Sequence, residues 1–397
     1  MDFALGETQQ AVADLAARVL GQGGSLAQPA GPDARNADET TYDAALWKEL
    51  GQAGLLSLAL PAWLGGDGLG VLDTATALTE VGRRAAPVPA LATLILGVLP
   101  VVRWGGRDLQ QALLAGVAHG DTVLTAAVRE PSDPMPPVPA TTARLRGTAL
   151  SGDPGTALSG DRGTVSGVKI GVPYAAAADW ILVPASIAAD GTGTGTRTGV
   201  VIVDPSADGV FLTPAHSSGA APEYTLRLDG APVRHVLGEP GTGTAGRALA
   251  DLYQLAIAGA CCLADGALSA ALALTTAHVR SREQFGRPLA TFQAVAQQIA
   301  DVYIVARTLH LATLSACWRL ETGREAGGDL DVAAYWLTAQ APAALRTCHH
   351  LHGGMGMDVS YPLHRYSALI RDLVRFVGGA DYRLDRLGAG VGAGVGG

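Results

Sequence analysis

Two stretches of the chain place chemically useful side chains and bends at breaks between helical patterns. The first, SREQFGRPLATFQAV (281–295), contains Arg282, Phe285 and Gln293. The second, CHHLHGGMGM (348–357), contains Gly353 and Gly354 after another helical pattern. Glycine lets a backbone approach a ligand closely, and bare backbone amides suit a phosphate group. Together the two stretches predict a site that holds a pyrophosphate and an adenine.

The first break also has a purely structural explanation. Arg282 suits the last turn of a helix, where a cation complements the helix dipole. Gly286 can stop that helix, with Phe285 packed back against the stop. The pair Arg287-Pro288 then blocks continuation, because the residue before a proline avoids helical angles. Neither stretch is a G-x-G-x-x-G after a strand, so the pattern excludes a Rossmann site.

The elements that carry these stretches follow from hydrophobic periodicity. Helical spacing predicts helices before residue 120, and short β-branched runs such as TVLTAAV, TVSGVKIGV and TGVVIVD predict strands up to residue 237. Helical spacing then returns in long apolar segments, which pack as a bundle. The predicted fold class is therefore α+β, mainly α. Its parts are an N-terminal helical domain (1–120), a small middle β-barrel-like domain (121–237), a C-terminal four-helix bundle (238–387) and a flexible Gly-rich tail (388–397).

Composition limits the classes of function. The chain has 397 residues, a net charge of −8, 48% hydrophobic and 16% charged residues. The mild acidity argues against nucleic acid or an anionic membrane as a partner. The four cysteines lack paired metal-ligand spacing and fall in helical patterns, which indicates buried thiols in a cytoplasmic protein and no metal site. The apolar content predicts some burial against other subunits.

At this point the sequence resembles the acyl-CoA dehydrogenase family over nearly its whole length. ALALTTAHVRSREQFGRPLATFQAVAQQIADVY (271–303) is similar to the family's most specific signature, and HLHGGMGMDVSYPLHRYSALIRDL (350–373) is similar to its second. The N-terminal stretch GLLSLALPAWLGGDGLGVLDTATALTEVGRRAAPVPALAT also resembles the family's helical domain. The family fold, a helical domain, a β-barrel-like domain and a four-helix bundle, agrees with the division reached from periodicity.

The resemblance implies FAD as cofactor and α,β-dehydrogenation of an acyl thioester. It assigns Arg282, Phe285 and Gln293 to the FAD of a neighbouring subunit, and Gly353 and Gly354 to its diphosphate and adenosine end. His350 stands where the family usually has a glutamine. The resemblance further implies a dimer of dimers, an acyl-CoA or acyl-carrier thioester as substrate, and electron transfer flavoprotein as acceptor.

The sequence departs from the family where the family has its catalytic base. In the family a glutamate removes the α-proton, and it comes from one of two places. The matching positions here fall near Ala256 and Ala380, and neither is acidic. Asp251 and Asp381 are the nearest carboxylates and are weak candidates, since a helix end or loop explains each of them.

The flavin-ring half of the family pattern is altered as well. TAAVREP (125–131) has Arg129 where the family has a threonine, so the resemblance assigns Arg129 to the cofactor site. KIGVPYA (169–175) replaces a tryptophan–isoleucine–threonine segment. Three readings follow: a flavin-dependent acyl-thioester dehydrogenase, either complete or as the base-lacking subunit of a heteromer; the same fold repurposed for monooxygenase-type or non-redox biosynthetic chemistry; or a purely structural partner subunit.

Overall fold

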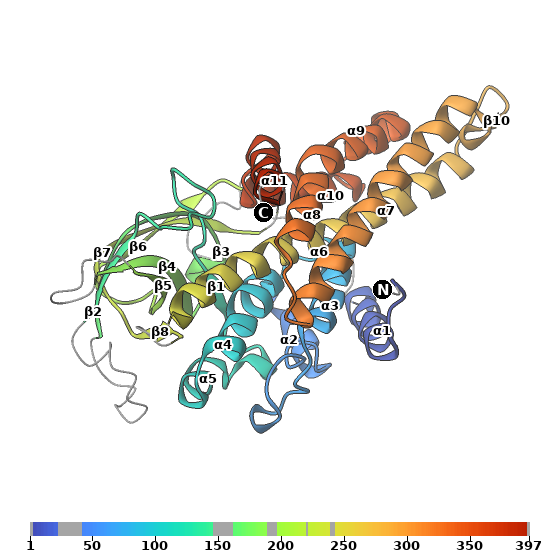
Figure 1. Cartoon of the computed structure of the whole chain (residues 1–397). Coiled ribbons are helices and arrows are strands. Elements are labelled where there is room, and N and C mark those ends of the chain that lie inside the picture. Colours follow the sequence, from blue (N-terminus) through green and yellow to red (C-terminus); the bar gives the residue numbers. More distant parts are fainter. Residues whose placement is uncertain are drawn as a thin grey trace.

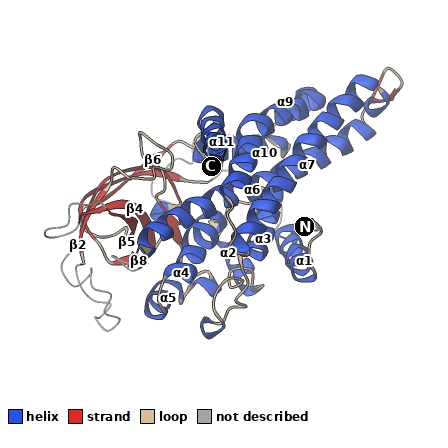
Figure 2. Cartoon of the chain, in the orientation of Figure 1, coloured by secondary structure: helices blue, strands red, loops and turns tan. Residues whose placement is uncertain are grey.

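The computed structural model describes residues 3–22, 42–145, 162–188, 197–219, 221–238 and 243–394. Helices come first, a sheet follows, and long helices complete the chain (Figures 1 and 2). This order confirms the predicted fold class. The helices of the N-terminal part are α1 (Glu7–Gln22), α2 (Ala44–Gln52), α3 (Val71–Arg84), the π-helical segment η3 (Leu91–Val98), α4 (Leu99–Trp104) and α5 (Arg107–Leu114), with short 3₁₀ turns at Ala62–Leu64 and Val117–His119.

The middle part is an eight-stranded sheet with the strand order β6-β7-β3-β2-β4-β5-β8, and β1 pairs with β4. Alternating apolar side chains of these strands form a core of their own, which includes Val165, Ile181 and Val201. The strands are β1 (Leu124–Ala126), β2 (Thr142–Leu145), β3 (Gly163–Pro173), β4 (Trp180–Ala188), β5 (Arg197–Val203), β6 (Val210–Ala215), β7 (Glu223–Pro232) and β8 (His235–Leu237).

The β-branched runs predicted five of these strands and missed three. The missed strands are β2, β6 and β8, of which β2 and β8 have four and three residues. Segments this short show too little alternation to be recognised from sequence. In β6 the exposed Phe211, Thr213 and Pro214 hide the pattern.

The C-terminal part is built on α6 (Thr244–Ser281), a helix of 38 residues that is buried along most of its length. Around it pack α7 (Gln293–Glu321), α8 (Gly327–Tyr335), α9 (Ala341–His352) and α10 (Leu363–Phe376). The π-helical segment η8 (Trp336–Gln340) joins α8 to α9, and α11 (Ala380–Gly394) packs on α8. The helix α11 covers residues 388–394 of the segment that composition predicted as a flexible tail, because an established helix gains one hydrogen bond for each residue added.

The most apolar window of α6 is long and apolar enough to cross a membrane, but 83% of it is buried inside the protein. It is therefore a core helix. Its first turns contact β5 and β8, and its last turns extend to the far end of the bundle (Figure 1). At 1.5 Å per residue the helix is about 57 Å long, so its two ends serve different parts of the molecule.

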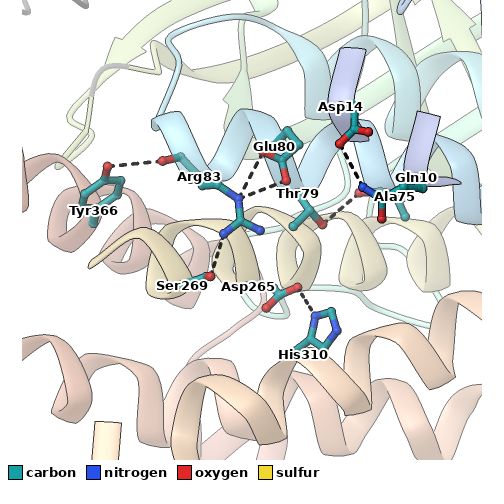
Figure 3. Close-up of polar contacts among 10 residues, drawn as sticks. All are labelled: Gln10, Asp14, Ala75, Thr79, Glu80, Arg83, Asp265, Ser269, His310 and Tyr366. Carbon is teal, nitrogen blue, oxygen red and sulfur yellow. Dashed lines mark hydrogen bonds and ion pairs between the residues drawn. The ribbon is translucent and has the colours of Figure 1, made fainter. Parts of the chain in front are cut away.

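Glycines let α3 cross α6 at very short distance. A Cβ atom on Gly266 of α6 would lie 1.9 Å from the carbonyl oxygen of Thr79, and one on Gly82 of α3 would lie 2.2 Å from the carbonyl oxygen of Leu263. Figure 3 shows polar contacts beside this crossing: Arg83 donates to Ser269 at 2.7 Å, and Tyr366 of α10 donates to the carbonyl of Arg83 at 3.3 Å. The crossing fixes α3 and α10 on one side of the long helix.

Candidate functional site

The corner, residues 282–293, lies at the end of the bundle that is remote from the sheet (Figure 1). The helix α6 ends at Ser281, and the short strands β9 (Glu283–Gln284) and β10 (Arg287–Pro288) form a hairpin. Phe285 and Gly286 make its two-residue turn with φ values of 55° and 76°. Such angles are typical of the tight turns that join paired strands.

Phe285 does not pack back against the helix end, so that prediction is wrong. Its side chain is 92% exposed, and its described ring contact is an edge-on one with Phe292 at 6.2 Å between centroids. The turn carries the ring outward because the helix stops before the hairpin rather than at Gly286. A positive φ strains a non-glycine residue, and an exposed phenylalanine ring adds no burial energy to the chain itself. Phe285 is therefore a candidate for contact with another molecule.

The glycine bend, residues 353–357, follows α9 and is also open. Gly353 has a φ of 60° and ψ of −138°, a conformation that other residues rarely adopt. A Cβ atom on Gly353 or Gly354 would meet no atom of the chain within 4 Å. His350 and Gln293, at the end of α9 and the start of α7, are exposed as well. The bend therefore presents bare backbone to the outside, as a diphosphate contact requires.

The structure joins the corner to the glycine bend through two histidines that sequence reasoning did not assign to the site. His278, in the last turn of α6, stacks on His352, the last residue of α9, with 4.5 Å between ring centroids. His352 is held by Tyr361 at 3.0 Å and by the carbonyl of Cys348 at 2.8 Å. The sequence could have indicated them, because His278 lies four residues before Arg282 and His352 lies one residue before Gly353.

The ring-side segments, residues 125–131 and 169–175, lie elsewhere, where the sheet meets α10. Lys169 Nζ donates to Glu130 Oε1 at 2.7 Å, with side-chain exposures of 0% and 2%. Burial lowers the pKa of Lys169 to about 8, against the pull of Glu130. Burial is the largest single influence on Glu130 and alone would raise its pKa, but the hydrogen bond and charge of Lys169 together with the hydrogen bonds from Thr141 outweigh it and leave that pKa lowered.

Arg129 crosses the same region beside Gly171. A Cβ atom on Gly171 would lie 2.6 Å from Nη1 of Arg129, and the Arg129 Nε is buried without a hydrogen-bond partner within the described chain. Burial lowers the pKa of Arg129, while nearby Glu223 raises it. Glu223 in turn accepts from Arg375 of α10 at 2.9 Å, and burial raises its pKa.

The corner and the glycine bend fit FAD differently from the ring-side segments. The corner and the glycine bend fit its diphosphate and adenosine end, since their amides and side chains are open. The ring-side segments do not fit a flavin ring in the way of the family pattern. Arg129, which stands where the family pattern has a threonine, fills the space beside Gly171, and charged pairs occupy the surrounding space.

The two positions that the sequence resemblance pointed to for the base are alanines. Ala256 is fully buried on α6, and Ala380 begins α11. Asp251 accepts from Trp104 Nε1 at 2.7 Å and Arg103 Nε at 2.9 Å, so it ties α4 to α6. Burial raises its pKa, against the pull of Arg103. Asp381 is exposed in the first turn of α11, where a carboxylate suits the helix dipole.

Two cavities border these regions. One of about 240 Å³ lies between α3, α10 and the start of β7, and Glu223 lines it. A second of about 260 Å³ lies between α6, α8 and α11 and is lined by Tyr253, Asp331 and Arg383. Within the described ranges, no group of three or more His, Cys, Asp or Glu side chains is arranged to hold a metal ion. The four cysteines are buried and free.

Comparison with known proteins places this geometry in context. Family models for the N-terminal and C-terminal domains of acyl-CoA dehydrogenase match residues 7–121 and 252–387. Acyl-CoA dehydrogenase FadE28 of Mycobacterium tuberculosis is 43% identical over 391 residues, which is 98% of both chains. Among solved structures, a Tcur3481-Tcur3483 steroid ACAD variant matches with a TM-score of 0.85 at 32% identity, covering 99% of this chain and 100% of that one. The ChsE4-ChsE5 complex of Mycobacterium tuberculosis matches with a TM-score of 0.83 at 30% identity over 99% of both chains.

The C-terminal family model covers the corner and the glycine bend, and the N-terminal model covers the helices that precede the sheet. The matches run through the whole fold rather than through one motif. The chain therefore belongs to the acyl-CoA dehydrogenase family, whose members are FAD-dependent oxidoreductases that act on CH–CH groups.

Proposed function

We propose that this chain is the base-lacking subunit of a heteromeric acyl-CoA dehydrogenase that acts on an acyl thioester. The observation that supports this proposal is a difference between the two regions of the chain that would contact FAD. The corner and the glycine bend are open to a neighbouring subunit, whereas the chain's own ring-side segments are occupied by Arg129 and the buried pair of Lys169 and Glu130.

In this assembly the corner contributes to a cofactor whose ring is held by the partner subunit. Leu263 of α6 lines the cavity beside the ring-side segments, and Arg282 directly follows the last residue of α6, 19 positions later in the sequence. The rise of a helix puts them roughly 28 Å apart. Arg282 and Phe285 thus lie far along the bundle from the chain's own ring-side segments, which suits contact across a subunit boundary.

The missing base belongs to the same proposal. Because Ala256 and Ala380 cannot accept a proton, the partner subunit supplies the carboxylate that removes the α-proton. The bound FAD supplies the redox chemistry of the family. This chain contributes binding of the adenosine part of FAD, and it excludes water from the boundary between the two subunits.

The relatives support the remaining parts of the proposal. Two solved structures that match at 30% identity or more are described as pairs of different chains, and one of these as a steroid ACAD. We infer a dimer of dimers with a steroid-like acyl-CoA as substrate and electron transfer flavoprotein as acceptor. The buried free thiols favour a cytoplasmic location.

A second candidate function rests on the charged ring-side segments. A self-sufficient oligomer that binds no flavin would use the same fold for non-redox chemistry. This alternative explains Arg129 and Lys169 but leaves the exposed Phe285 without a function, so the heteromer is favoured.

The test is purification of the chain alone and together with the products of neighbouring genes. The proposal expects a colourless chain alone, and a yellow complex with one flavin for each pair of unlike chains. Visible absorbance gives the flavin content, and mass measurement of the intact complex gives the subunits. A yellow, active assembly of this chain alone would overturn the proposal, and a colourless, self-sufficient oligomer would favour the second candidate.

A further inference from the structure

The glycine bend is held from below by a histidine of the last turn of α9. The ring of His349 lies between the bend and α10: its Nδ1 is 3.0 Å from the carbonyl oxygen of Gly356, and its Nε2 is 2.6 Å from Oγ of Ser367. Gly356 is buried, whereas Gly353 and Gly354 are exposed. His349 therefore contacts the buried residue of the bend and leaves its two exposed glycines to the outside.

The two partners of His349 determine where its ring carries the proton. A backbone carbonyl only accepts hydrogen bonds, so Nδ1 carries the proton and donates to Gly356. In the neutral ring Nε2 then accepts from the hydroxyl group of Ser367. Burial lowers the pKa of His349, and the nearby His352 and Arg371 lower it further against the pull of the Gly356 carbonyl. The neutral ring, with both nitrogens satisfied, is therefore the form present near pH 7.

The bend also packs closely on this turn of α9. A Cβ atom on Gly356 would lie 3.0 Å from Cβ of His352 and 3.3 Å from Nδ1 of His349. Glycine allows this approach because it has no side chain to keep the two segments apart. The bend is thus fixed on α9 by packing and by the hydrogen bond from His349.

The same turn of α9 is connected to the corner. His352 stacks on His278 of α6, which lies four residues before Arg282. A contact that fixes the bend on α9 therefore also fixes where the bend lies relative to Arg282. A ligand that contacts both regions binds more tightly when their placement is preset, because less conformational freedom is lost on binding.

We propose that His349 is a positioning residue for FAD, whose Nδ1–H donates to Gly356 and holds the glycine bend in the conformation that receives the diphosphate. The ring acts through Gly356 rather than on the cofactor. The inference rests on the proposed function, which gives the bend its ligand, whereas the hydrogen bond itself lies within a single chain.

Variants at His349 separate this hydrogen bond from the shape of the ring. His349→Asn puts an amide N–H near the position of Nδ1 and keeps the donor to Gly356. His349→Gln puts its amide near the position of Nε2, so it keeps a contact with Ser367 and loses the donor to Gly356. His349→Leu removes both contacts. Arg346→Gln, an exposed position one turn earlier on α9, is the control.

The first measurement is hydrogen exchange of the backbone amides of residues 353–357 in the full-length chain alone. We expect about tenfold faster exchange in the Gln and Leu variants, as for loss of one hydrogen bond, and little change in the Asn variant and the control. Urea unfolding shows whether each variant is folded. If the Leu variant does not fold, the Gln variant decides.

The second measurement is release of FAD from the complex of each variant with its co-expressed partner, followed by flavin fluorescence after dilution. We expect about tenfold faster release in the Gln and Leu variants and unchanged release in the Asn variant and the control. Equal exchange in the Asn and Gln variants, or faster exchange with unchanged FAD release, would overturn the proposal. If no complex with flavin forms, the proposed function fails, and the exchange measurement still decides whether His349 holds the bend.

Discussion

The imidazole rings of His278 and His352 stack with 4.5 Å between their centroids and 18° between their planes. One ring comes from the last turn of α6 and the other from the last residue of α9. The stack brings the corner and the glycine bend together, although they are separate in the sequence. Burial and the neighbouring His352 lower the pKa of His278, which keeps the His278 ring uncharged over a wider pH range.

Arg282→Ala is expected to weaken retention of FAD in the complex. An arginine that binds a phosphate or base edge makes charge-assisted hydrogen bonds that alanine cannot replace, so we expect about a tenfold or greater loss of FAD affinity. Flavin absorbance after repeated gel filtration measures it. Arg280→Ala is the control, because Arg280 is an exposed arginine two residues away in the same turn. Equal flavin retention in both variants would count against the assignment of Arg282.

Lys169→Met is expected to destabilise the chain by about 3–5 kcal/mol, because it leaves the Glu130 carboxylate buried without its cation. The amides of Ala140 and Thr141 still donate to Glu130, at 2.7 and 2.9 Å. The double variant Lys169→Met with Glu130→Gln should therefore recover part of the loss. Urea unfolding at neutral pH measures both. A single variant as stable as the unaltered chain would show that the pair contributes little.

Gly266→Ala tests the crossing of α3 and α6. The added methyl group would lie 1.9 Å from the carbonyl oxygen of Thr79, so the helices must separate, at a cost of about 1–3 kcal/mol or more. Gly328→Ala is the matched control: Gly328 is an exposed helical glycine with no atom within 4 Å of its Cβ position. That change should be neutral or slightly stabilising. Thermal unfolding that falls equally in both variants would contradict the crossing.

Protonation of His235 is expected to lower the free energy of unfolding in acid. Burial, and then Arg162 and Arg234, lower its pKa from 6.5 to about 4. Between these values the unfolded chain binds a proton that the folded chain does not, so stability falls as pH decreases through this window. The contribution is of the order of 3 kcal/mol.

The variant His235→Leu should remove that part of the pH dependence. Urea unfolding of both proteins at several pH values from 4 to 7 gives the difference, in which the shared effects of the carboxylates cancel. The difference between the two free energies of unfolding should be constant near pH 7 and should shift in favour of the variant as the pH falls toward 4. Parallel curves would show that His235 does not titrate in this window.

Hydrophobic periodicity predicted the long elements because each buries one continuous face. The 38 residues of α6 and the 29 of α7 repeat their apolar spacing over many turns, so local sequence is sufficient to identify them. The three short strands β2, β6 and β8 depend on their neighbours in the sheet, and no local pattern marks them.

The candidate site also has features that local sequence predicts and features that depend on the tertiary structure. By itself the sequence determined that Arg282, Phe285, Gln293 and the glycines 353 and 354 stand at breaks suited to a nucleotide, because glycine, proline and charge act locally on the backbone. Only the tertiary structure decided that Phe285 points outward and that His278 stacks on His352. It also decided that Lys169 pairs with Glu130 and that Arg129 lies near Glu223. The physical reason is that burial and the pairing of charges depend on segments far apart in the chain, which the sequence does not order in space.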